Sequence, residues 1–75
     1  MKLPSFTPKR LIRVFIHLGF LIDHQTGSHV VLRHPDGRRT VIAVHNRELK
    51  RGTLLGIFKQ AGYSAEEFVE LLHEI

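Results

Sequence analysis

The sequence predicts an α+β sandwich in which three antiparallel strands are covered on one face by helices. Three observations predict it: a hairpin-turn signature between two segments rich in β-branched residues, apolar residues at helical spacing on both sides of that hairpin, and sequence motifs that start helices. The expected order is helix, strand, strand, strand, helix, helix, which suits helices gathered on one face of an antiparallel sheet. Because 75 residues are too few for two cores, we expect one domain spanning residues 1–75.

The N-terminal part predicts a helix followed by a short strand. Thr7 can cap the helix, and Pro8 suits its first position, where a missing N–H has no partner to lose. Apolar residues then recur at helical spacing on one face, at Leu11, Val14, Phe15 and Leu18. Gly19 should end this helix. The apolar run over residues 20–23 predicts a strand, and residues 25–27 predict a turn.

The middle of the chain predicts a β-hairpin. Residues 28–34 and 39–44 are rich in β-branched side chains and flank Pro35-Asp36-Gly37-Arg38, a turn signature. Antiparallel pairing across this turn should make paired residue numbers sum to roughly 72–74. His45 should therefore lie near His29 at the open end of the hairpin. An even sum would place the two rings on one face of the sheet, and an odd sum would not.

Two helices are expected at the C-terminal end. Residues 45–52 are polar and irregular, after which Thr53 should cap a second helix that ends at Gly62. Ser64-Ala65-Glu66-Glu67 has the form of a capping box and predicts a short third helix.

The charge is unevenly distributed along the chain. The formal net charge is +4, but residues 1–59 hold all 11 basic residues and three of the seven acidic ones, a net of +8. The last 16 residues hold four acidic residues and no Lys or Arg, a net of −4. A basic body with an acidic C-terminal helix favours a polyanionic partner, with nucleic acid first.

The composition excludes several classes of protein. Without Cys there are no disulfides, no thiolate metal sites and no Cys catalysis. No apolar run approaches the roughly 20 residues of a membrane span, and the N-terminus lacks the features of a signal peptide, so we expect a cytoplasmic protein. No His and carboxylate cluster has metal-ligand spacing, and we expect no metal and no other cofactor. A zinc site of three histidines across the hairpin stays an alternative.

Of the six histidines, His29 and His45 attract attention. His24, His29 and His34 are five apart, a spacing that indicates little, because residues five apart on a strand point to opposite faces. His29 follows Gly27 and Ser28, small residues that let a ligand approach the backbone. An imidazole beside a basic run suits RNA cleavage, in which a base takes the 2′-hydroxyl proton and cations stabilise the charged transition state. The alternative to a catalytic role is structural: His29 would be a strand residue that donates a hydrogen bond to a turn carbonyl, and His45 would cap its own loop.

The sequence resembles the HicA family of small toxin ribonucleases from prokaryotic toxin–antitoxin pairs, because several motifs of that family occur in it in the same order. The matching motifs are Gly19-Phe20, Gly27-Ser28-His29, the turn over residues 34–39, and the entry and body of the second helix over residues 48–54 and 57–62. Ala43 stands where the family often has Pro. The resemblance implies a fold like that of the double-stranded-RNA-binding domain, with an extra short C-terminal helix here.

The resemblance also implies an activity. It implies metal-independent cleavage of mRNA that arrests translation, with His29 as the catalytic residue. It implies a HicB-like antitoxin that covers the active site and connects the complex to operator DNA, so that DNA is contacted only through the antitoxin. We expect further candidates to contact RNA or stabilise the transition state: Ser28, Arg38, Arg39, His45, Lys50 and Arg51.

Two other classes of function remain open from the sequence. In one, the protein is a non-catalytic RNA-binding module of the same fold, and its basic residues contact phosphates and 2′-hydroxyls. In the other, it is a DNA-binding or interaction domain whose basic face docks an acidic protein.

Overall fold

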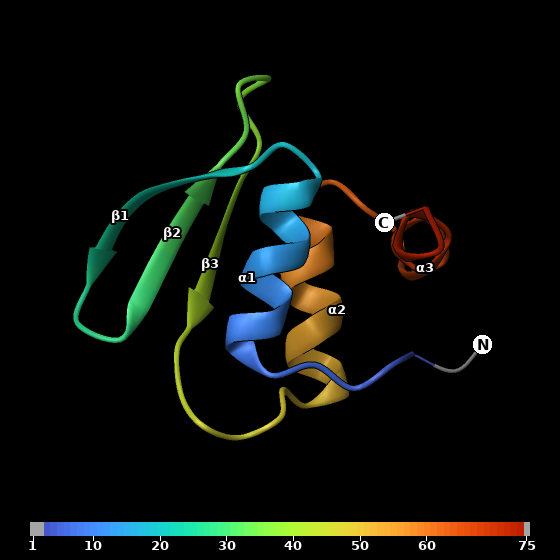
Figure 1. Cartoon of the computed structure of the whole chain (residues 1–75), viewed down its shortest axis with the longest axis horizontal. Coiled ribbons are helices and arrows are strands. Elements are labelled where there is room, and N and C mark those ends of the chain that lie inside the picture. The colour runs from blue at the N-terminus through green and yellow to red at the C-terminus, as the bar shows by residue number, and fades with distance from the viewer. Residues whose placement is uncertain (1–2, 75) are drawn as a thin grey trace.

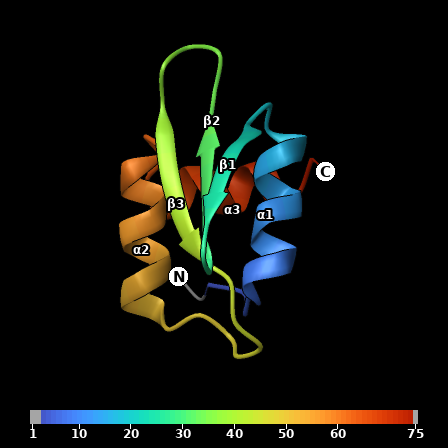
Figure 2. The ribbon, with the colours of Figure 1, turned by 90° about the vertical axis from the view of Figure 1, so that its left-hand side faces the viewer.

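The computed structural model describes residues 3–74 and has the predicted order of elements (Figure 1). The elements are α1 (Pro8–His17), β1 (Leu21–Thr26), β2 (His29–Arg33), β3 (Arg39–Ala43), α2 (Arg51–Gln60) and α3 (Ala65–Leu72). The strands form one antiparallel sheet in the order β1-β2-β3. Figures 1 and 2 show α1 and α2 against one face of this sheet, α1 toward β1 and α2 toward β3, with α3 lying farther from the sheet and crossing behind it in Figure 2. The predicted α+β sandwich is thus confirmed.

Phenylalanine rings fill the space between the sheet and the three helices. Phe68 of α3 stacks on Phe58 of α2, with ring centroids 4.1 Å apart, and also packs against Phe15 of α1. The sheet contributes Val30, Leu32 and Ile42 to this core. Alternate residues of β2 and β3 therefore point at the helices, and the residues between them point away.

The first strand differs from the sequence prediction. Residues 20–23 were expected to form it, but Phe20 is fully buried before the strand begins, with its ring edge-on to Phe15 at 5.0 Å. The strand instead runs over Leu21–Thr26, and each of its residues is exposed. Its polar half forms a strand because the backbone pairs with β2, a long-range contact that the local sequence does not show. The following turn is correspondingly later, at Gly27 and Ser28 rather than over residues 25–27, with Gly27 at φ 57°.

β1 also carries a β-bulge. Ile22 pairs with Leu32 while His24 pairs with Val31, so Asp23 is an extra residue without a partner on β2. At the opposite edge of the sheet α2 contacts β3, where the side-chain oxygen of Gln60 accepts hydrogen bonds from the Thr40 hydroxyl at 3.0 Å and the backbone N–H of Val41 at 3.4 Å.

The hairpin of β2 and β3 follows the prediction closely. Each strand is slightly shorter than expected, and the backbone N–H of His34 donates to the carbonyl of Arg38 at 2.8 Å across the turn. His29 pairs with Ala43, so paired residue numbers sum to 72, the even case.

α2 begins earlier than predicted. Thr53 was expected to cap it, but the N-cap is Lys50, whose side chain makes no capping hydrogen bond. The physical reason lies just before the helix, where Leu49 is buried and its N–H donates to the carbonyl of Phe6 at 2.7 Å. This contact fixes where the chain turns, and the helix starts directly after it.

The predicted capping box of α3 is confirmed. The Ser64 hydroxyl accepts from the N–H of Glu67 at 3.1 Å, and the Glu67 carboxylate accepts from the N–H of Ser64 at 3.0 Å. Within residues 3–74, each helix is too short or too polar to reach across a lipid bilayer.

Candidate nucleic-acid interface

We define the open face as the side of the sheet that points away from the helices. Val30 and Leu32 point into the core, so the residues alternating with them, and the partners of those residues on β1 and β3, share the other side. The open face comprises Leu21, His24, Thr26, His29, Val31, Arg33, Arg39, Val41 and Ala43. Val31 forms its floor, since its neighbours leave it only 5% exposed.

His29 is exposed at one end of the open face. It opens β2 and lies between Thr26 of β1 and Ala43 of β3. Within residues 3–74 its imidazole has no hydrogen-bond partner, so the alternative in which it bonds a turn carbonyl is not observed. Both ring nitrogens of His29 are therefore available to a ligand on this face.

Ser28 and His45 lie beside His29 at the same end of the hairpin. The N–H of Val44 donates to the carbonyl of Ser28 at 2.6 Å, which continues the pairing one step beyond β3. His45 follows that pair, and its Nδ1 accepts a hydrogen bond from the N–H of Arg47 at 3.1 Å. His45 thus caps its own loop, and this bond leaves its Nε2 as the nitrogen that carries the proton in the neutral ring.

The basic residues that follow His45 in the sequence lie at two separate places on the surface. Lys50 lines a surface hollow of about 430 Å³ together with His45, Arg47 and Thr53. Arg51, the first residue of α2, lies instead beside a different hollow with Ser5 and Leu54. Lys50 and His45 therefore share a surface, whereas Arg51 faces the N-terminal segment.

Arg38 and Arg39 lie at the far end of the hairpin. Arg39 is on the open face directly opposite Arg33, four residues along β3 from Ala43 and hence about 13 Å from the His29 position. Arg38 instead donates to the Asp36 carboxylate at 2.8 Å and to the carbonyl of Ala61 at 3.1 Å. Its contacts connect the hairpin turn to the corner between α2 and α3, and contact with RNA stays a prediction for this residue.

Sequence reasoning missed a cluster of ionisable side chains, in which Asp23 at the bulge contacts His24 and Arg33 of the open face. Nδ1 of His24 lies 2.7 Å from Oδ2 of Asp23, and Nε of Arg33 lies 3.7 Å from Oδ1 of the same carboxylate. The hydrogen bond from His24, together with nearby Arg33, holds the pKa of the Asp23 carboxyl below its usual value. No local pattern indicated this cluster, because it depends on the bulge at Asp23.

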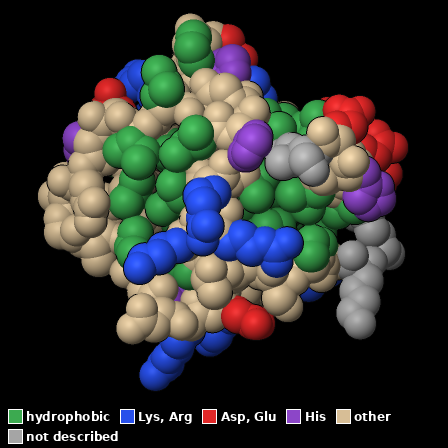
Figure 3. Space-filling view, viewed as in Figure 1, with side chains coloured by type: hydrophobic (Ala, Val, Ile, Leu, Met, Phe, Trp, Pro, Cys, Tyr) green, Lys and Arg blue, Asp and Glu red, His purple; other side chains and the backbone are tan. Residues whose placement is uncertain are grey.

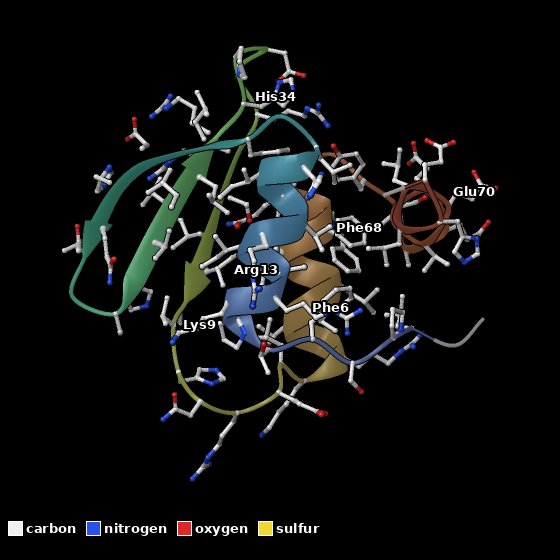
Figure 4. The ribbon with its side chains drawn as sticks, in the orientation of Figure 1. Phe6, Lys9, Arg13, His34, Phe68 and Glu70 are labelled. Carbon is white, nitrogen blue, oxygen red and sulfur yellow. The ribbon has the colours of Figure 1, made fainter. Side chains whose placement is uncertain are left out.

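A second group of cations lies on α1, outside the sheet. Figure 3 shows Lys and Arg side chains gathered over α1 and acidic side chains gathered over α3. Figure 4 places Lys9 and Arg13 on the solvent side of α1 and Glu70 on α3. The separation of charge predicted along the sequence is thus also a separation in space.

The described residues offer no metal-binding cluster. Over residues 3–74, no three side chains of His, Asp or Glu come close enough together to hold an ion.

Comparison with known proteins identifies the family of the chain. A search of the curated proteins finds no match. A family model, described as the HicA toxin of bacterial toxin–antitoxin systems, matches residues 8–63, which include the whole sheet, α1 and α2. The chain therefore belongs to the HicA family and is the toxin of a toxin–antitoxin system.

Proposed function

We propose that this toxin is a metal-independent endoribonuclease that cleaves mRNA and thereby arrests translation, with His29 as its catalytic residue. The observation that carries the proposal is the position of His29, exposed on the open face with no hydrogen-bond partner for its ring within residues 3–74. Arg33 and Arg39 lie on the same face and supply the positive charge that an RNA strand requires.

Cleavage of RNA without a metal ion requires an imidazole that can transfer a proton and nearby positive side chains. In our proposal His29 takes the proton from a ribose 2′-hydroxyl, and the resulting oxygen attacks the adjacent phosphorus. The bond from phosphorus to the 5′ oxygen breaks, and positive side chains stabilise the extra negative charge of the transition state. Because DNA lacks the 2′-hydroxyl, the same site would leave DNA intact.

Further residues are proposed to hold the RNA strand around His29. Ser28 directly precedes His29, His45 follows the last backbone contact of the hairpin, between Val44 and Ser28, and Lys50 shares a hollow with His45. Arg39 lies farther along the open face. The full set of proposed contacts is Ser28, Arg38, Arg39, His45, Lys50 and Arg51.

We also propose that the whole chain acts as one toxin domain in the cytoplasm and that a HicB-like antitoxin neutralises it by covering the open face. A partner that binds only the folded toxin raises its apparent stability, by about 2.7 kcal/mol at a free concentration 100 times the Kd. Operator DNA would then be reached only through the antitoxin.

The melting temperature of the toxin should rise on mixing with the protein encoded by the neighbouring reading frame, and an unchanged melting temperature would count against this partner.

The activity is tested with purified protein, single-stranded RNA and EDTA. The wild type should cleave the RNA, and His29→Ala of verified fold should not. His73→Ala is the matched control, since it removes an exposed histidine from the end of α3. If the wild type binds RNA but leaves it intact, the protein is an RNA-binding module. Cleavage that survives in His29→Ala would show that another residue does the chemistry.

A further inference from the structure

We propose that His24, positioned by Asp23, is the second proton-transfer residue of the open face and acts as the general acid that protonates the departing 5′ oxygen of RNA. This inference rests on the proposed ribonuclease activity and adds to it a residue that the motif around His29 does not contain. It is carried by the placement of His24 on the sheet and by its contact with Asp23.

The bulge in β1 brings His24 onto the same face as His29. On a regular strand, the pairing of Ile22 with Leu32 would place Asp23 opposite Val31 and would turn His24 toward the helices. The extra residue shifts the register by one, so that His24 itself pairs with Val31. A bulge that redirects one side chain is a common device next to active sites.

The pairing also fixes how close the two histidines come. His29 is two residues from Val31 along β2, so His24 and His29 are diagonal neighbours on adjacent strands. Diagonal neighbours have Cα atoms about 7–8 Å apart, within reach of aromatic side chains. Two imidazoles at this spacing can lie on either side of one phosphodiester.

Asp23 orients the ring of His24. Its Oδ2 is 2.7 Å from Nδ1, so Nδ1 carries the proton of that bond, and Nε2 is left for a ligand. The carboxyl of Asp23 has a lowered pKa, chiefly through this hydrogen bond, and it stays ionised beside the ring. Nε of Arg33 lies 3.7 Å from the other carboxylate oxygen of Asp23.

Two guanidinium groups on the same face indicate what ligand fits. Arg33 and Arg39 are directly opposite each other on β2 and β3, and like charges in that position repel. Arg39 has no ion-pair partner within residues 3–74. A phosphate group of a bound strand would offset this repulsion, so the face that holds both histidines also favours a phosphodiester chain.

The reaction then balances without a metal ion or an outside reagent. His29 accepts the 2′-hydroxyl proton, the 2′ oxygen forms a bond to phosphorus, and the bond to the 5′ oxygen breaks. Nε2–H of protonated His24 gives its proton to that oxygen, and Asp23 stabilises the imidazolium until it does so. The products are a 2′,3′-cyclic phosphate and a free 5′-hydroxyl. His24 ends neutral and His29 protonated.

The test compares two RNA substrates that differ in one atom. One is ordinary RNA, and the other has sulfur in place of the 5′ oxygen at the cleaved bond. A thiolate leaves without being protonated, because thiols are far more acidic than alcohols. We expect His24→Ala to slow cleavage of ordinary RNA by about 10²–10³-fold and to cleave the sulfur substrate within about threefold of the wild type. His29→Ala should be slow on both substrates, and the control His73→Ala should be normal on both.

A pH profile gives a second measurement on the same variants. With two proton-transfer groups the wild type should show a bell-shaped dependence of kcat/KM on pH, and His24→Ala should lose the decline on the alkaline side. Asp23 contacts His24 from the bulge, and Arg33, Arg39 and His29 are the charged or titratable groups that share the open face with His24.

The outcomes separate this inference from the proposed function. If His24→Ala is fully active, or equally slow on both substrates, His24 is not the general acid, although cleavage that needs His29 would still stand. If the wild type cleaves neither substrate, or if His29→Ala cleaves as fast as the wild type, the proposed function fails and the inference fails with it.

Discussion

The guanidinium group of Arg38 donates a hydrogen bond to the backbone carbonyl of Ala61, 23 positions later in the chain, at 3.1 Å. The same group lies 5.0 Å from the ring centroid of Tyr63 and 5.4 Å from that of Phe20. One side chain of the hairpin turn thus contacts the segment before β1 and the corner between α2 and α3.

We therefore expect Arg38→Ala to destabilise the fold. It removes a charge-assisted hydrogen bond and two cation–π contacts, a loss of about 1–3 kcal/mol in the free energy of unfolding. The neighbouring substitution Arg39→Ala, on the exposed open face, should change it by less than about 0.5 kcal/mol. Urea denaturation of both variants measures the difference, and equal midpoints would contradict the contact.

Phe68 is expected to be essential for folding. Its ring is fully buried and stacks on Phe58 at 4.1 Å. Phe68→Ala should cost about 3–5 kcal/mol, which equals the stability that a core of this size typically supplies. The far-ultraviolet circular dichroism of this variant should be that of an unfolded chain at 25 °C, whereas Val69→Ala, beside it on α3, should stay folded. A cooperative unfolding transition in Phe68→Ala would contradict the prediction.

Acid should destabilise the protein through three surface carboxyl groups. A hydrogen bond from the backbone of Arg38 is the main cause that lowers the pKa of the Asp36 carboxyl. A hydrogen bond from the backbone of Ser64 does the same for the pKa of Glu67. The side chain of His24 is the main cause that lowers the pKa of Asp23. A lowered pKa in the folded state means stability that is present above the unfolded pKa and lost as pH falls through the folded value. The melting temperature should fall as pH drops below about 4. In Asp36→Asn the fall should be shallower, and an identical pH dependence would exclude Asp36 as a source.

The basic residues after His45 should set the salt dependence of RNA binding. Removing one side chain that binds a phosphate should reduce the slope of log K against log salt by about 0.7 for a single strand. Lys50→Ala with Arg51→Ala should therefore weaken binding and flatten this slope. Lys59→Ala, at the other end of α2, is the matched control and should leave the slope unchanged. An unaltered slope in the double variant would remove both residues from the RNA surface.

The parts of the fold that local chemistry determines could be predicted from the sequence. The hairpin follows from a turn whose Gly37 adopts φ 100°, and its strands flank that turn directly. The start of α3 follows from the reciprocal hydrogen bonds of Ser64 and Glu67, which are also local. In each case the residues that decide the structure lie within a few positions of one another.

The parts that long-range contacts determine could not be predicted in the same way. α2 starts where buried Leu49 bonds to Phe6, 43 positions earlier, and Thr53 carries no sign of that contact. At the candidate site, the sequence predicted that His29 lies at the open end of the hairpin, but it did not decide whether the paired residue numbers have an even or an odd sum. The contact between His24 and Asp23 on the same face as His29 could not be predicted, because a one-residue bulge decides to which face of the sheet His24 points.

The bulge at Asp23 also makes the exposed edge strand of the sheet irregular. Along the β3 edge of the sheet the side chain of Gln60 accepts a hydrogen bond from the N–H of Val41, whereas the β1 edge carries exposed Leu21 and Ile22, beside which a foreign strand could add. An irregular margin is a poor template for such growth, since its outward amide and carbonyl groups no longer form an even row. Shortening the chain by Asp23 alone would straighten that row, and the apolar pair beside it would then favour aggregation into fibres.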